Sequence, residues 1–176
     1  MTSDRQRGFS ILEILVAMGL TAMLLTLAAG ALRNYWLAHS LDGAQDELIA
    51  QVRERQEKAV SESHPLVFGL RLLEGSSQWG VVEYVPDDPS TTGTDEESCV
   101  QTALLTFGTG VQVSSASFAA SAEATFCSTV FADASDYVFF YPRGTATAGT
   151  MTLLQPITNR TRVVTVSPIT GRVQGA

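Results

Sequence analysis

One carboxylate, Glu13, lies at the edge of an apolar stretch and is the most unusual ionisable group in the sequence. It directly precedes Ile14 to Leu32, nineteen residues without a charge. An ionised side chain at the centre of a bilayer costs about 2.5 kcal/mol or more, so it is usually paired or functional. Because the apolar residues Phe9, Ile11 and Leu12 precede it, Glu13 lies about one turn into the longer hydrophobic segment, which leaves a second interpretation, a carboxylate that extends to the cytoplasmic headgroups. The chemistry indicated here is charge pairing in an apolar environment.

Two cysteines, Cys99 and Cys127, are the second candidate group. Both follow the apolar stretch, and an oxidising compartment would allow them to form a disulfide. Two buried free thiols are the alternative that the sequence leaves open. A zinc site is not expected, because the two histidines, His39 and His64, have no ligand spacing with the cysteines.

A polar acidic segment, residues 86–98 (PDDPSTTGTDEES), is the third candidate. Carboxylate oxygens are ligands that calcium prefers, but the EF-hand spacing is missing. A solvated loop is therefore the preferred interpretation, and we predict no bound metal. The acidic residues of this segment are Asp87, Asp88, Asp95, Glu96 and Glu97.

The apolar stretch that follows Glu13 has the length of a membrane span, since a bilayer-crossing helix needs about 20 residues. Arg5 and Arg7 precede it, whereas the sequence after Arg33 soon turns acidic. The positive-inside rule then leaves the N-terminus in the cytoplasm and exports the rest of the chain. The chain as a whole has 11 Lys+Arg against 18 Asp+Glu, a formal net charge of -7. This balance argues against general binding of polyanions, which requires clustered basic residues.

The order of the N-terminal features differs from that of a secretory signal peptide, because the small residue Gly8 precedes the apolar stretch. The stretch from Arg7 to Val16, RGFSILEILV, resembles the processing site of type IV prepilins and type II secretion pseudopilins. That pattern is a short basic leader, Gly before the cut, Phe after it, and Glu five residues into the mature chain.

This resemblance implies that residues 1–8 are a leader removed by a prepilin peptidase. The cut would fall between Gly8 and Phe9, followed by N-methylation of Phe9, and Glu13 would guide the addition of subunits. The assembly role of Glu13 has a physical basis, because the new α-ammonium of Phe9 could pair with the carboxylate of a neighbouring helix in a filament core. Two buried charges would then offset each other.

The helical pattern continues beyond the membrane, with no proline between Met1 and Ser63. We predict a membrane or filament-core helix over residues 9–34 and an amphipathic continuation over 35–62, ended by Pro65. Apolar residues recur in the continuation at a spacing near 3.5 residues, and we expect them to pack on the chain's own sheet. These residues are Leu41, Ala44, Leu48, Val52 and Ala59.

Residues 63–176 show the shorter period of strands and predict a β-rich head. The fold class is therefore α+β, a long N-terminal helix packed on a mostly antiparallel β-sheet or β-sandwich. The segment from Val113 to Thr129 is Ser/Ala-rich, and we expect it to be irregular or partly helical. The six predicted strands are Leu66 to Leu73, Trp79 to Val85, Gln101 to Phe107, Tyr137 to Tyr141, Met151 to Leu154 and Thr161 to Val166.

The head itself resembles the GspH/FimT-type domain of minor pseudopilins and related minor type IV pilins. The resemblance is carried by Phe140 to Gly144, the strand from Met151, Arg162 to Ser167 and Gly171 to Val173, with Gln56 to Val60, Pro65 to Leu70 and Trp79 to Val81 at the domain's opening. The acidic segment and the cysteine pair depart from the pattern and leave the subtype open.

Together the two resemblances imply a structural minor pilin or pseudopilin without a cofactor. The chain would be held in the bacterial inner membrane by a single pass, with its head in the periplasm, and would later enter a type IV pilus or a type II secretion pseudopilus. Its partners would be other pilins or pseudopilins through the N-terminal helix, the prepilin peptidase and the assembly platform. An enzyme is not expected, because the sequence has no G-x-S-x-G, no H-E-x-x-H and no phosphate loop.

Two alternatives remain. A DNA-binding minor pilin for DNA uptake would need a basic patch, and four arginines in the last third of the chain could form one. We favour a scattered, solvated set, so nucleic acid is not an expected partner. A membrane-anchored adhesin or receptor that never enters a filament would leave Gly8 uncut and Glu13 dispensable. The four arginines are Arg143, Arg160, Arg162 and Arg172.

Overall fold

The computed structural model describes residues 10–62, 66–87, 97–108, 110–132, 135–168 and 172–175. The chain forms two compact units, Met1–Trp36 and Leu37–Ala176. Helix α1 (Ile11–Ser61) contributes residues to both. The amphipathic half of this helix therefore belongs to the same unit as the strands.

The first unit consists of the apolar part of α1. Its large hydrophobic side chains are exposed, from Ile11 to Trp36. Thr21 and Thr26 direct their hydroxyls to the carbonyls of Met18 and Met23, at 3.0 and 2.8 Å, which satisfies both polar groups within the helix. The helix is long and apolar enough to cross a membrane, as the sequence predicts.

The second unit begins with the amphipathic part of α1. The predicted apolar stripe is buried, and it is joined by Leu37 and Gln45 on the same side of the helix. The helix ends at Ser61, one residue before the predicted end.

Within the described residues, eight antiparallel strands form two four-stranded sheets. The first sheet has the order β3-β2-β1-β5, and the second has the order β4-β6-β7-β8. The first sheet contains β1 (Val67–Leu73), β2 (Gln78–Val85), β3 (Ser98–Thr106) and β5 (Ser135–Phe140). The second contains β4 (Gln112–Phe118), β6 (Gly149–Gln155), β7 (Arg160–Val166) and β8 (Val173–Gly175). All six predicted strands are present.

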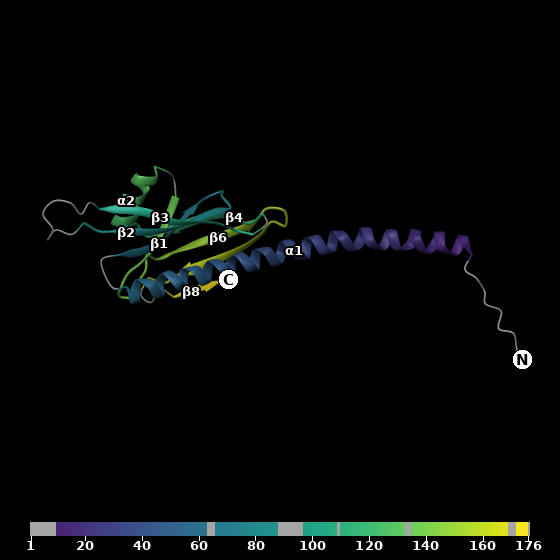
Figure 1. Ribbon diagram of the computed structural model, residues 1–176, viewed down its shortest axis with the longest axis horizontal. Coiled ribbons are helices and arrows are strands. Elements are labelled where there is room, and N and C mark those ends of the chain that lie inside the picture. The colour runs from purple at the N-terminus through teal and green to yellow at the C-terminus, as the bar shows by residue number, and fades with distance from the viewer. Residues whose placement is uncertain are drawn as a thin grey trace, which may run out of the picture. The chain divides into compact units, whose positions relative to one another are not determined.

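The main core is enclosed by one face of each sheet and by the apolar stripe of α1. Leu48 and Val52 of the helix meet Leu70 and Val81 of the first sheet and Leu153 of the second in a single buried cluster. The opposite face of the first sheet is covered by a short helix, α2 (Ala122–Phe131). Within the head, α2 and α1 thus lie on opposite sides of the first sheet (Figure 1).

The segment from Val113 to Thr129 is more regular than the sequence indicates. It contains most of β4 and of α2, so the expectation of an irregular segment is wrong for β4 and correct only in its helical part. A register shift between Val113 and Ser115 interrupts the alternation of apolar and polar residues. Because of this bulge, a search for period-two alternation in the sequence does not detect the strand. The start of α2 is set by Ser121, whose hydroxyl accepts from the amide of Ala124 at 3.2 Å.

Candidate functional site

Glu13 lies in the first turn of α1, where its amide donates to the carbonyl of Ser10 at 3.0 Å. A shallow hollow of about 550 Å³ follows the same helix face, lined by Glu13, Ile14, Ala17, Met18 and Thr21. The carboxylate is the single charged group among these lining residues. The arrangement offers one anionic group beside a strip of apolar surface, which suits pairing with a cation carried by another apolar helix. The predicted processing residues, Gly8 and Phe9, lie outside the described residues.

Two polar contacts fix the head part of α1 to the second sheet. Asp42 accepts from the guanidinium of Arg162 on β7, with nitrogen–oxygen distances of 2.9 and 2.8 Å. Gln45 donates through Nε2 to the carbonyl oxygen of Val163 at 3.3 Å. Gly175 of β8 leaves room for this amide, because a Cβ there would lie 2.3 Å from Nε2 of Gln45. The sequence signal for the anchor is a polar residue, Gln45, at a buried position of an apolar stripe.

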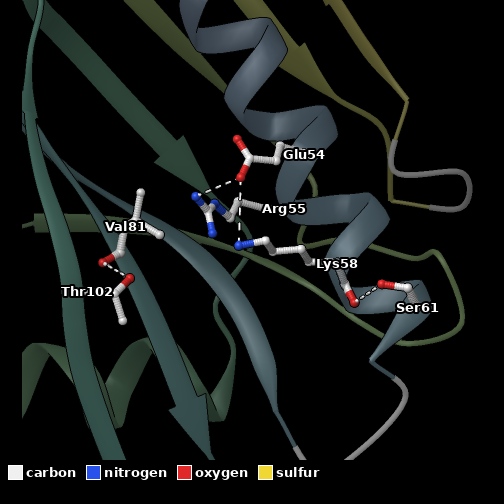
Figure 2. A network of polar contacts seen from close by, with 6 residues as sticks. All are labelled: Glu54, Arg55, Lys58, Ser61, Val81 and Thr102. Atoms are coloured by element: carbon white, nitrogen blue, oxygen red, sulfur yellow. Dashed lines mark hydrogen bonds and ion pairs between the residues drawn. The ribbon is translucent and has the colours of Figure 1, made fainter.

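The last turns of α1 carry a second set of polar contacts, drawn in Figure 2. Glu54 pairs with Arg55 at 3.2 Å and with Lys58 at 3.7 Å. Ser61 donates its hydroxyl to the carbonyl of Lys58 at 3.2 Å. Gln56 on this part of the helix donates to the carbonyl of Gly144 at 3.4 Å. The first three contacts lie within the helix, and the contact of Gln56 joins the end of α1 to the turn after β5.

Cys99 of β3 and Cys127 of α2 form a disulfide, with their Cα atoms 5.4 Å apart. The disulfide links α2 to the face of the first sheet that lies away from α1. Cys127 is fully buried there among aromatic residues that include Phe139. The pairing that the sequence left open is thereby defined in the structure.

Two tyrosines beside the disulfide donate to carboxylates. Tyr141 donates to Glu123 at 3.1 Å, and burial, followed by the charge of Glu123, raises the pKa of the Tyr141 phenol to about 12. Tyr84 donates to Glu97, and burial, followed by that hydrogen bond, raises its pKa well above the ordinary value. A raised phenol pKa keeps both groups neutral, as donors, across the physiological range.

The four arginines considered for an alternative basic patch do not share one position. Arg160 and Arg162 lie two residues apart on β7, and Arg162 is paired with Asp42. Arg172 lies at the other end of β7, because its carbonyl accepts from the amide of Ser167 at 2.9 Å. That end is about 20 Å from Arg160, given about 3.3 Å per strand residue. Arg143 lies in the turn after β5.

Of the residues considered for metal or acid–base chemistry, only some lie within the described ranges. His39 is an exposed residue of α1, whereas His64, Asp88, Asp95 and Glu96 lie outside them. Among the described residues, no group of three or more His, Cys, Asp or Glu is placed to hold a metal ion.

Two family models match the chain. Residues 3–29 match the prokaryotic N-terminal methylation motif. Residues 44–171 match the type II transport protein GspH, which covers nearly the whole head. The chain belongs to the GspH family. The GspH match confirms the resemblance predicted from the head, and the methylation motif confirms the one predicted from the N-terminus.

Two solved structures resemble this chain at low sequence identity. The minor pseudopilin EpsH from the type 2 secretion system of Vibrio cholerae is 14% identical, covers 78% of this chain and 96% of its own, and has a TM-score of 0.51. The type IV minor pilin FimU of Pseudomonas aeruginosa is 17% identical over 77% of this chain and 92% of its own, with a TM-score of 0.46. A comparison with curated proteins finds no match. The likeness to EpsH confirms a pilin-like α+β fold.

Proposed function

We propose that this GspH-family protein is a structural subunit of a type II secretion pseudopilus or a type IV pilus. Family and fold support a minor pseudopilin or minor pilin. In this proposal the chain is anchored in the inner membrane by a single pass, with the head in the periplasm, and then moves into a filament. Its role is assembly, without a catalytic step.

The observation that carries the proposal is the exposed apolar surface of α1 from Ile11 to Trp36, with Glu13 at its start. So large an apolar surface must be covered by lipid or by other apolar helices. A membrane alone would cover it, with the carboxylate of Glu13 extended to the headgroups, but would give that carboxylate no cationic partner on another helix. A bundle of identical or related helices explains both, because the carboxylate can pair with the α-ammonium that cleavage creates on a neighbour.

The processing steps follow from this role. Cleavage between Gly8 and Phe9 by a prepilin peptidase removes the leader, and methylation modifies the amine of Phe9. Residues 9–34 then form the filament-core helix, residues 35–62 the amphipathic continuation, and residues 63–176 the head. The partners are other pilins or pseudopilins, the peptidase and the inner-membrane assembly platform.

The test is mass spectrometry of the mature N-terminus from native membranes, in cells with and without prepilin peptidase. We expect a chain that begins with N-methylated Phe9 only when the peptidase is present. A Gly8→Ala variant should retain residues 1–8, and Ser3→Ala is the matched control within the leader. An intact leader in peptidase-containing cells, or a cut beyond Leu32, would leave a membrane-anchored or secreted receptor as the better description.

A further inference from the structure

The two sheets of the head have four edges, and three of them are protected by the chain itself. An open edge presents unpaired backbone donors and acceptors to any other extended chain, so proteins usually cover it. The edge strand β8 is only three residues long. The edges at β4 and β5 are covered by neighbouring segments.

The edge of β4 is covered by the turn between β1 and β2. Gly75 donates its amide to the carbonyl of Val113 at 2.8 Å, and Val113 donates to the carbonyl of Ser76 at 2.9 Å. A carboxylate oxygen of Glu74 accepts from the amide of Ala116 at 3.0 Å. Gly75 has φ +73°, a left-handed conformation that this turn requires.

The edge of β5 is covered by the segment that follows the strand. Thr147 donates its amide to the carbonyl of Phe139 at 3.0 Å, and its hydroxyl accepts from the amide of Phe139 at 2.9 Å. Tyr141 donates its amide to the carbonyl of Thr145 at 2.9 Å. The C-terminal part of this edge is therefore already paired.

The fourth edge, β3, differs from the others. It is nine residues long, and its backbone bonds among the described residues are with β2. Its sequence, SCVQTALLT, contains no charged residue and no proline, two of the usual protections of an exposed edge, and its one protective feature is a bulge. Two large apolar side chains on it are exposed, Val100 at 53% and Leu104 at 55%. These properties suit a strand that accepts another strand.

A bulge in β3 turns two of its side chains toward one face. The register of β2 and β3 shifts between Val81 and Val82, which makes Thr102 the extra residue on β3. The hydroxyl of Thr102 donates to the carbonyl of Val81 at 3.5 Å (Figure 2). Gln101 pairs with Val82, and Leu104 pairs with Gly80. Both side chains therefore lie on the face that carries α2, although they are three positions apart.

Beside this edge the same face holds a pocket of about 250 Å³, whose lining includes Arg71, Leu73, Gly80, Gln101 and Leu104. Gly80 lies between Arg71 and the edge, and a Cβ there would lie 2.8 Å from Oε1 of Gln101. The absent side chain lets Arg71 reach across β2 and donate through Nη1 to that oxygen at 2.6 Å. The pocket therefore combines a cation with two apolar side chains, Leu73 and Leu104, and with the polar side chain of Gln101.

The guanidinium of Arg71 is held in place on its other sides. Its Nε donates to the hydroxyl of Ser135 at 3.1 Å, and its Cζ lies 4.5 Å from the centre of the Phe131 ring. A positioned guanidinium loses less rotamer freedom when it binds a carboxylate than a mobile one does.

We propose that the outer edge of β3 binds an extended, acidic segment of a partner protein as an added strand. Backbone hydrogen bonds to β3 would supply affinity, and the pocket would supply specificity. In the bound state an acidic side chain pairs with Arg71, and apolar neighbours in that segment contact Leu104 and Leu73. The uncharged, apolar edge of β3 suits an extended partner segment, and the cation of Arg71 beside it suits an acidic one. This site lies on the head and does not depend on the proposed filament role of α1.

The test uses the full chain in detergent with its disulfide intact. The probes are a short capped peptide of alternating Val and Thr with a central Glu, the same peptide with Lys in place of Glu, and the Glu peptide with alternate backbone nitrogens methylated. Binding is followed by fluorescence anisotropy, and amide hydrogen exchange reports on residues 98–106. We expect the Glu peptide to bind and to slow exchange in β3. The Lys peptide should bind about tenfold more weakly, as expected for loss of a charge-assisted hydrogen bond.

Variants separate the edge from the pocket. Leu104→Asp places a negative charge beside the pocket, where it repels the Glu peptide, and should abolish binding of that peptide, whereas Val130→Asp, at a 50% exposed position of α2, should leave it unchanged. Arg71→Gln should remove the preference for the Glu peptide over the Lys peptide. Because Leu104 is exposed, its variant tests the site even if Arg71→Gln fails to fold.

Three results would overturn the proposal. The methylated peptide could bind as well as the Glu peptide, which would indicate adhesion to apolar surface. The amides of β3 could exchange as slowly in the free protein as those of β1, which would mean that the chain covers its own edge. The Glu peptide could also fail to bind at about 1 mM, the limit of weak but specific association.

Discussion

The two parts of α1 contain similar apolar residues but place them in opposite environments. Leu24 in the first unit is 65% exposed, whereas Leu48 in the second is fully buried. The difference lies in the pattern, because the first part is apolar on all faces and the second has an apolar stripe with charged residues elsewhere. One continuous helix thus contributes a surface for other molecules and a core element for its own head.

This comparison predicts opposite effects of the same substitution in the two parts. Leu48→Ala should lower the free energy of unfolding of the head by about 2 to 5 kcal/mol, because it leaves a cavity in a closed core. Leu24→Ala should leave head stability unchanged. Denaturant titration of the detergent-solubilised chain, followed by near-ultraviolet circular dichroism, measures both. Equal losses in the two variants would mean that the parts are not energetically distinct.

A comparable effect is expected on the opposite side of the first sheet, where the disulfide holds α2. Replacing Cys99 and Cys127 together by serine should lower head stability by about 3.6 kcal/mol in the chain-entropy model, for cysteines separated by 28 residues. Reductant should destabilise the wild-type chain and leave the double variant unchanged. If α2 stays protected from hydrogen exchange after reduction, packing rather than the disulfide holds it.

The smallest effect is expected for the polar anchor between α1 and β7. The pair formed by Asp42 and Arg162 is partly exposed, so its coupling energy should be below about 1 kcal/mol and should fall with added salt. A double-mutant cycle of Asp42→Asn and Arg162→Gln measures it, with Arg160→Gln as the neighbouring control. A coupling as large as the loss from Leu48→Ala would show that charge, and not apolar burial, fixes the helix on the head.

The helix, six strands and the family could be predicted from the sequence because each has a local signal. The stripe from Leu41 to Ala59 has helical spacing, and the leader motif is contiguous. β4 was missed because its bulge breaks the alternation, and the three-residue β8 was missed because it is too short to show one. A sequence pattern detects an element only when the alternation of apolar and polar residues stays regular over several residues.

The contacts that hold the head together have no such local signal. Asp42 and Arg162 are 120 residues apart, and Arg71 meets Gln101 across a third strand at Gly80. Their meeting depends on strand order and register, which short windows of sequence do not encode. The open edge of β3 follows likewise from which edges the chain covers elsewhere.

In the proposed function, the carboxylate of Glu13 makes the apolar part of α1 an assembly element. The most direct measurement is the fraction of the chain found in sheared filaments rather than in membranes, for wild type, Glu13→Gln and Asp46→Asn. Asp46 is the matched control, an exposed acidic residue on the head part of the same helix. We expect Glu13→Gln to remain in the membrane with its filament fraction reduced more than about tenfold, since removing one partner of a buried charge pair is strongly destabilising. A Glu13→Gln chain that enters filaments as the wild type does would contradict the claim.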